Sequence, residues 1–122
     1  MKIGYARVST SEQNLDLQID ALEKAGCDRI YQDKASGLKE SRPEFDKMLD
    51  ALREGDQVVV WKLDRIGRST KHLHQISERF KAAKIEFCSL TESIDTSTPI
   101  GQLFFTMMAA LAQFEADRLR ER

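Results

Sequence analysis

Four short apolar segments alternate along the chain with segments of helical periodicity, and this alternation limits the fold more than any other feature of the sequence. The apolar segments are residues 1–8, 29–31, 57–61 and 85–90. Three consecutive valines, Val58 to Val60, make the third segment apolar on both faces, which is typical of a central parallel strand. Strand–helix repeats imply right-handed crossovers, so we predict an α/β fold with a mostly parallel sheet of about four to five strands flanked by helices.

Start and stop signals separate the helical segments. They predict one helix that follows residues 9–11 and ends at Gly26, a second from Pro43 to Gly55, and a third from about Thr70 to Ala83. Residues 33–42 are polar and have no periodicity. We therefore predict a mobile loop there.

The last helical segment begins at Pro99 and contains no stop signal before residue 122. Its apolar residues surround almost the full circumference for three turns, so the helix must be buried on more than one side. We expect Leu103, Met107 and Phe114 to pack on the sheet, and the opposite face to form a contact between copies of the chain. The expected oligomer interface consists of Phe104, Phe105, Met107, Met108 and Leu111.

The composition argues for one domain with a local site rather than a broad charged surface. The chain has 122 residues, and its 19 basic and 20 acidic residues give a net charge of −1, which disfavours strong nonspecific binding of nucleic acid. No apolar stretch is long enough to span a membrane and no signal peptide is recognisable, so we expect a cytoplasmic location. Cys27 and Cys88 are expected to be buried thiols, and no metal site or cofactor is predicted.

Basic residues and one serine follow the ends of two predicted strands. Tyr5, Arg7 and Ser9 lie at the end of the first strand. A second group follows the third strand and consists of Asp64, Arg65 and Arg68. Arg42, at the end of the predicted loop, can approach both groups. Sites in open parallel sheets lie at this edge. Guanidinium groups bind phosphate oxygens in a planar, two-pronged manner and stabilise phosphoryl-transfer transition states without a metal. The pattern therefore indicates a phosphate-handling site.

Each of these residues also fits a purely structural role. Ser9 is a suitable helix cap, and Arg7 is a suitable charge at a strand edge. The charged residues after the third strand also fit a solvated salt-bridge cluster. A metal-dependent nuclease would need clustered carboxylates, and the glycine-rich loops of nucleotide-binding sites are absent from the sequence.

At these residues the sequence resembles the serine recombinases of the resolvase–invertase family. The resemblance extends over residues 1–122, and several ordered motifs carry it: Y-A-R-V-S-T followed by Gln13, S-G before R-P at Arg42, V-V-W-K-L-D-R-I-G-R-S, and Glu121-Arg122. The run S-L-T-E-S-I-D-T-S, together with W-K-L-D-R, looks most similar to the DNA invertases of phages and bacteria.

The resemblance implies a role for each matching residue. Ser9 matches the nucleophile that attacks a DNA phosphodiester, becomes joined to the 5′ phosphate and releases a 3′ hydroxyl. Asp64 matches a carboxylate that orients the site or serves the leaving oxygen. The arginines that hold the phosphate match Arg7, Arg65, Arg68 and, on the loop, Arg42, and the supporting positions match Tyr5, Gln13, Glu121 and Arg122.

The resemblance also implies partners and a domain organisation. The partners are double-stranded DNA and further copies of the chain, as homodimer and homotetramer. Residues 1–98 match the catalytic domain, residues 99–122 match the start of a long oligomerisation helix, and the helix-turn-helix DNA-binding domain of typical members is absent from this chain. Gln102 and Thr106 differ from the nearest invertases, which leaves open whether an enhancer-binding accessory protein such as Fis takes part.

Two other functions remain open at this level. One is an oligomerisation or regulatory domain that retains the fold without the activity, which the full serine and arginine set disfavours. The other is a small phosphate-binding domain similar to response regulators. Such a domain would need an acidic pocket at the strand ends, and these ends are basic.

Overall fold

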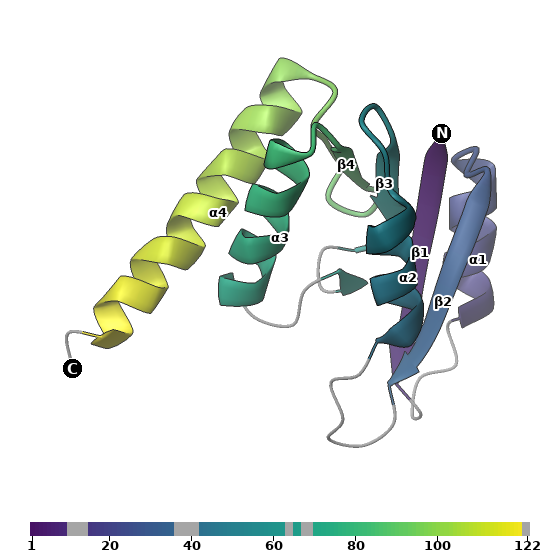
Figure 1. The fold of residues 1–122 in the computed structure, drawn as a ribbon, viewed down its shortest axis with the longest axis horizontal. Helices are drawn as coiled ribbons and strands as arrows, with labels where there is room; N and C mark the ends of the chain where they lie inside the picture. The colour runs from purple at the N-terminus through teal and green to yellow at the C-terminus, as the bar shows by residue number, and fades with distance from the viewer. Residues whose placement is uncertain (10–14, 36–41, 63–64, 67–69, 121–122) are drawn as a thin grey trace.

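A five-stranded sheet with the order β2-β1-β3-β4-β5 forms the centre of the protein (Figure 1). The computed structural model describes residues 1–9, 15–35, 42–62, 65–66 and 70–120. The elements in chain order are β1 (Lys2–Ser9), α1 (Leu15–Lys24), β2 (Arg29–Ala35), α2 (Pro43–Ala51), β3 (Gln57–Val60), α3 (Thr70–Ala82), β4 (Glu86–Ser89), β5 (Ile94–Asp95) and α4 (Pro99–Arg120).

The first four strands run parallel and β5 pairs antiparallel with β4, so the predicted α/β fold with a mostly parallel sheet is confirmed. The prediction of a loop from residue 33 onward was wrong at its start, because β2 continues to Ala35. Asp33 is only 6% exposed, and its hydrogen bonds to other segments keep this polar stretch in the sheet.

Two apolar clusters cover the two faces of the sheet, because alternate strand residues point to opposite sides. Tyr5, Val58 and Val60 pack on one face with residues of α2, α3 and α4. Ala6 and Val59 pack on the other face with Leu22 and further residues of α1. All three valines of β3 are buried, as predicted for a central strand, and Figure 1 shows α1 on the opposite side of the sheet from α2 and α3.

Both cysteines lie in the cluster on the α1 face. The sequence predicted buried thiols, but both residues are only half-buried. A Cβ atom on Gly4 would lie 3.1 Å from Sγ of Cys27, so the segment that follows α1 packs closely on β1. Burial raises the pKa of the Cys27 thiol to about 11 and also raises the pKa of Cys88. Both thiols are therefore protonated near neutral pH and are poor nucleophiles.

α4 begins at Pro99, packs beside α3 and extends away from the sheet at its C-terminal end (Figure 1). Two residues in the first turns of α4 contact the sheet strands β4 and β5. A Cβ atom on Gly101 would lie 1.7 Å from the carbonyl oxygen of Asp95, so only glycine permits this approach. One turn later, the ring of Phe105 stacks on Phe87 with a centroid distance of 5.0 Å.

This contact contradicts the prediction for Phe105 and for the face expected to pack on the sheet. Phe105 is 8% exposed and belongs to the core, whereas Leu103, Met107 and Phe114, which were expected to pack on the sheet, are about 60% exposed. The apolar pattern surrounds the helix and does not select a face. Gly101 selects it, because the residue one turn after the close approach also points to the sheet. Side chains of Phe104 and Met108 lie outside the described structure.

We predict that Phe105→Ala lowers the free energy of unfolding by about 3–5 kcal/mol, the usual cost of removing a buried phenylalanine ring. Thr106→Ala is the control on the same helix, and its exposed side chain predicts a change within about 0.5 kcal/mol. Urea denaturation followed by circular dichroism measures both values. Equal, small effects would contradict the assignment of the buried face.

Candidate active site

The carboxyl ends of β1 and β2 extend past the end of β3. The β1–β2 pairing continues to Ser9 and Ala35, whereas the β1–β3 pairing stops where Tyr5 lies opposite Val60. The last four residues of β1 therefore project beyond the neighbouring strand at the sheet edge where open α/β folds carry their sites. Arg7 and Ser9 lie on this projecting end.

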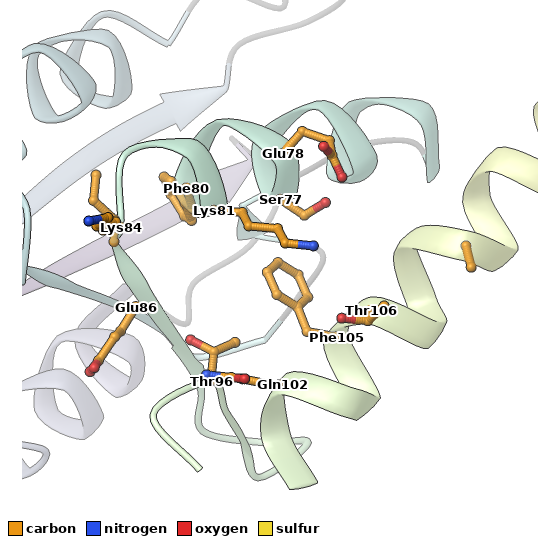
Figure 2. Close-up of a pocket in the computed structure, with 12 residues that line it drawn as sticks. Ser77, Glu78, Phe80, Lys81, Lys84, Glu86, Thr96, Gln102, Phe105 and Thr106 are labelled. Carbon is orange, nitrogen blue, oxygen red and sulfur yellow. The ribbon is translucent and has the colours of Figure 1, made fainter. Parts of the chain in front are cut away.

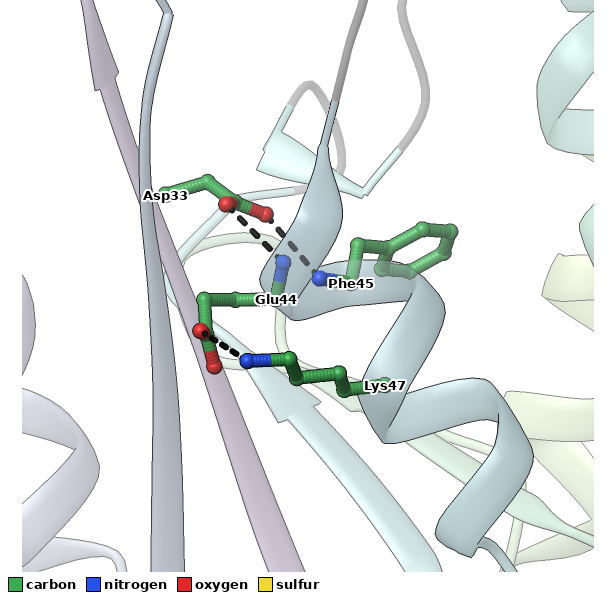
Figure 3. A network of polar contacts seen from close by, with 4 residues as sticks. All are labelled: Asp33, Glu44, Phe45 and Lys47. Atoms are coloured by element: carbon green, nitrogen blue, oxygen red, sulfur yellow. Dashed lines mark hydrogen bonds and ion pairs between the residues drawn. The ribbon is translucent and has the colours of Figure 1, made fainter.

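A buried carboxylate connects this end to α2. The hydroxyl of Tyr5 donates a 2.9 Å hydrogen bond to Oδ2 of Asp33. The backbone N–H groups of Glu44 and Phe45 donate to Oδ1 and Oδ2 of Asp33 at 3.1 and 3.0 Å, as Figure 3 shows. These N–H groups belong to the first turn of α2, which has no partners for them within the helix. Asp33 thus links β1, β2 and the N-terminus of α2.

Arg42 immediately precedes α2 and turns inward. Its side chain is 6% exposed, and Nη1 donates a 2.8 Å hydrogen bond to the carbonyl oxygen of Ile66. Its guanidinium carbon lies 3.9 Å from the ring centroid of Phe45 and 5.8 Å from that of Tyr5. The residue therefore connects the start of α2 to the segment after β3, which the sequence identified as the second group of basic residues.

Arg7 lies two residues after Tyr5 on β1, so its side chain projects from the same face of the sheet. It is 7% exposed. Burial raises the pKa of Tyr5 well above its usual range; Arg42 and Arg7 lower it, and Asp33 raises it further. Two guanidinium groups and a neutral phenol thus converge beside the end of β1.

The structure describes part of the predicted site. It brings Tyr5, Arg7 and Arg42 together, and it places Arg65 beyond β3, next to Ile66 and with its guanidinium 5.7 Å from the ring of Trp61. The backbone of Ser9 ends β1, but its side chain is not described. The remaining predicted site residues lie outside the described residues: Gln13, Asp64, Arg68, Glu121 and Arg122.

Sequence reasoning missed Asp33 and Gln18, although each carried a signal. Tyr31 and Asp33 are buried while Gln32 and Lys34 are exposed, so Asp33 occupies an inward position of the strand alternation. Gln18 lies on the apolar stripe of α1 and is fully buried. In both cases a polar residue occupies a position that the periodicity assigns to the core.

A pocket of about 730 Å³ lies elsewhere, between α3, α4 and β4. Phe80 and Phe105 contribute apolar surface, and Figure 2 shows the ring of Phe105 directed from α4 toward Ser77 and Lys81 of α3. None of the predicted catalytic residues is among those that line it. Within the described ranges, no helix is long and apolar enough to cross a membrane, and no three histidine, cysteine or acidic residues are grouped to hold a metal ion.

Residues 2–122 match the model of the family described as resolvase, N-terminal domain. The chain belongs to this family. Its resemblance to the serine recombinases is thereby confirmed. It is 52% identical over 122 residues to the transposon Tn917 resolvase of Enterococcus faecalis and 56% identical over 122 residues to the DNA-invertase of Escherichia phage P1.

Both alignments cover 100% of this chain but only 66% of each relative, so the chain spans just under two thirds of their length. Among solved structures, the N-terminal catalytic domain of TP901-1 integrase is similar, with a TM-score of 0.77 and 35% identity. That alignment covers 96% of this chain and 98% of the integrase domain. The fold is therefore that of a catalytic domain of this family.

The raised pKa of Tyr5 predicts a loss of stability in alkali. In the unfolded chain the phenol ionises near pH 10, whereas the folded protein keeps its proton above that pH. The folded state then binds more protons, so the free energy of unfolding falls as pH rises above about 10. We expect Tyr5→Phe to show a shallower fall.

Urea titrations between pH 8 and 11 measure this difference. All other ionisable groups are shared by the two proteins, so the difference in slope reports on Tyr5. Parallel curves for wild type and Tyr5→Phe would contradict the buried phenol–carboxylate contact.

Proposed function

We propose that this chain is the catalytic domain of a site-specific DNA recombinase in which Ser9 is the nucleophile. The observation that carries the proposal is a pair of buried arginines at the end of β1, the strand that terminates at Ser9. Arg7 lies on the same face of β1 as Tyr5, and the guanidinium of Arg42 lies over the Tyr5 ring. The family membership supports the same reaction, because the relatives named above are a DNA-invertase and a transposon resolvase.

In the proposed reaction, the Ser9 hydroxyl oxygen attacks the phosphorus of a DNA phosphodiester. The Ser9 hydroxyl loses its proton as its oxygen bonds to the 5′ phosphate and the bond to the 3′ oxygen breaks. The 3′ oxygen gains one proton and leaves as a hydroxyl, so the step neither consumes nor releases protons overall. Religation is the reverse reaction with an exchanged 3′ hydroxyl, so the phosphoester link conserves the energy of the broken bond and no ATP is consumed.

The arginines stabilise the negative charge that develops on the phosphate oxygens. Arg42 is already oriented by its hydrogen bond to Ile66 and by the ring of Phe45, so little reorganisation is needed when a phosphate arrives. Arg7, Arg65 and Arg68 complete the phosphate site, and Asp64 orients the groups or serves the leaving oxygen. Gln13, Glu121 and Arg122 support this arrangement. No metal ion has a part in the proposal.

The rearrangement of DNA that we propose is inversion. The motif similarity to DNA invertases supports it, but the identity to a resolvase is nearly as high as the identity to an invertase. The relative orientation of the two recombination sites in the native DNA distinguishes the two outcomes. Inverted sites are expected, and directly repeated sites would indicate resolution.

The full-length protein with Ser9→Ala is expected to bind its DNA site but to form no covalent adduct. The substrate is a nicked suicide duplex that traps the intermediate, and a denaturing gel followed by protein staining and DNA labelling detects it. Wild-type protein should yield a stable protein–DNA band. Adduct at the wild-type level in the alanine variant would overturn the assignment of Ser9, and no adduct from wild type would favour a domain that retains the fold without the activity.

We further propose that the chain self-associates through α4. The α4 stripe, defined by Ile100, Leu103, Met107, Leu111 and Phe114, consists of large apolar side chains that are 56–79% exposed. Their spacing of three and four residues is that of a helix–helix seam, for which a second copy of the same helix is a matching partner. Of the interface residues predicted from the sequence, Met107 and Leu111 belong to this stripe, whereas Phe105 does not.

Leu111→Glu is expected to shift the sedimentation of the protein toward monomer, because a charge would be buried at the contact. Leu17→Glu on α1 is the matched control, since Leu17 is 55% exposed and Leu111 is 56% exposed. Sedimentation velocity over a range of micromolar concentrations measures both. A strictly monomeric wild type, or an equal effect of both variants, would contradict an interface on the α4 stripe.

A further inference from the structure

The projecting end of β1 has a strand neighbour on one side only within the described part of the chain. β2 pairs with β1 as far as Ser9, but β3 pairs with it only as far as Tyr5. Backbone N–H and C=O groups beyond Tyr5 on the β3 side thus need other partners, because a buried backbone group without a hydrogen bond destabilises the fold.

The side chain of Gln18 supplies those partners at Arg7. Nε2 of Gln18 donates a 3.0 Å hydrogen bond to the carbonyl oxygen of Arg7, and the N–H of Arg7 donates a 3.2 Å hydrogen bond to Oε1 of Gln18. A primary amide offers a donor and an acceptor side by side, as a peptide group does. Gln18 therefore takes the place that a residue of a longer β3 would occupy.

The buried position of Gln18 favours both hydrogen bonds to the peptide of Arg7. The residue lies in α1 between Leu15 and Leu22 on the side that packs on the sheet, and it is 0% exposed. Removing an amide from water is costly unless both of its polar ends are bonded. Leucine would fit the apolar stripe of the helix, so packing alone does not call for an amide here.

We propose that Gln18 is a positioning residue for the reaction, which fixes the peptide of Arg7 and thereby the direction in which β1 presents the Arg7 guanidinium and Ser9. This role rests on the proposed function, in which Ser9 is the nucleophile. Ser9 lies two residues beyond the held peptide. Because phosphoryl transfer depends on in-line placement of the nucleophile, a small rotation of this strand end lowers the cleavage rate without weakening DNA binding.

The test compares Gln18→Met with Leu22→Ala in the full-length protein. Methionine has nearly the same length as glutamine but forms neither hydrogen bond to Arg7. Leu22 is fully buried in the same helix cluster, so Leu22→Ala lowers stability without touching that peptide. Single-turnover cleavage of a suicide duplex at saturating protein, the Kd for the same DNA, and the urea unfolding curve are measured for each, at a temperature at which all proteins are folded.

We expect Gln18→Met to reduce the cleavage rate by roughly 10- to 100-fold with an unchanged Kd, in line with the cost of misplaced reacting groups. Leu22→Ala should cleave at the wild-type rate although it is less stable. Gln18→Leu is the second variant should Gln18→Met fail to fold, and the same loss is expected of it.

Three outcomes would overturn this role. A wild-type cleavage rate in folded Gln18→Met would mean that the amide only satisfies the backbone. A loss no greater than that of Leu22→Ala would assign the effect to stability. The absence of any adduct from wild-type protein would overturn the proposed function itself, and the role of Gln18 with it.

Discussion

The buried carboxylate of Asp33 is the contact on which the arrangement of the site depends. It accepts hydrogen bonds from the Tyr5 hydroxyl and from two N–H groups of the first turn of α2, so one side chain joins two strands and a helix. A carboxylate is costly to bury, but the positive end of a helix and three donors offset much of that cost. Without it, the first turn of α2 would lose the hydrogen bonds that join it to β2.

The position of Arg42 follows from that attachment. Asp33 fixes where α2 begins, and Arg42 precedes the helix, so its guanidinium is directed between Phe45 and the carbonyl of Ile66. From the other face of the sheet, Gln18 holds the peptide of Arg7. Hydrogen bonds on opposite faces of the sheet thus position two arginines at the end of β1: Gln18 bonds the peptide of Arg7, and Ile66 bonds the side chain of Arg42. α4 packs beside α3 and contacts the sheet through Gly101 and Phe105, and these large apolar residues among its described side chains remain more than half exposed: Ile100, Leu103, Met107, Leu111, Phe114 and Leu119.

Much of the fold could be predicted because its signals are local. The valines of β3 identify a central strand, Pro99 marks the start of α4, and the arginines at the strand ends indicate where a site lies. The contacts that orient the site could not be predicted in the same way. The partners of Asp33 lie 28, 11 and 12 residues away and the partner of Gln18 lies 11 residues away, and periodicity assigns both positions to apolar residues. The buried face of α4 also depends on a distant contact, between Gly101 and Asp95.

Mass spectrometry of the protein–DNA linkage tests the role of Ser9 most directly. Covalent adduct from a suicide duplex is digested with nuclease and trypsin, and the peptide that retains a nucleotide is fragmented. Cleavage after Arg7 and Lys24 yields one peptide that contains Ser9, Thr10 and Ser11. We expect the 5′ phosphate to be attached to Ser9, the residue that ends β1. Attachment to Thr10, to Ser11 or to any other residue would contradict this role.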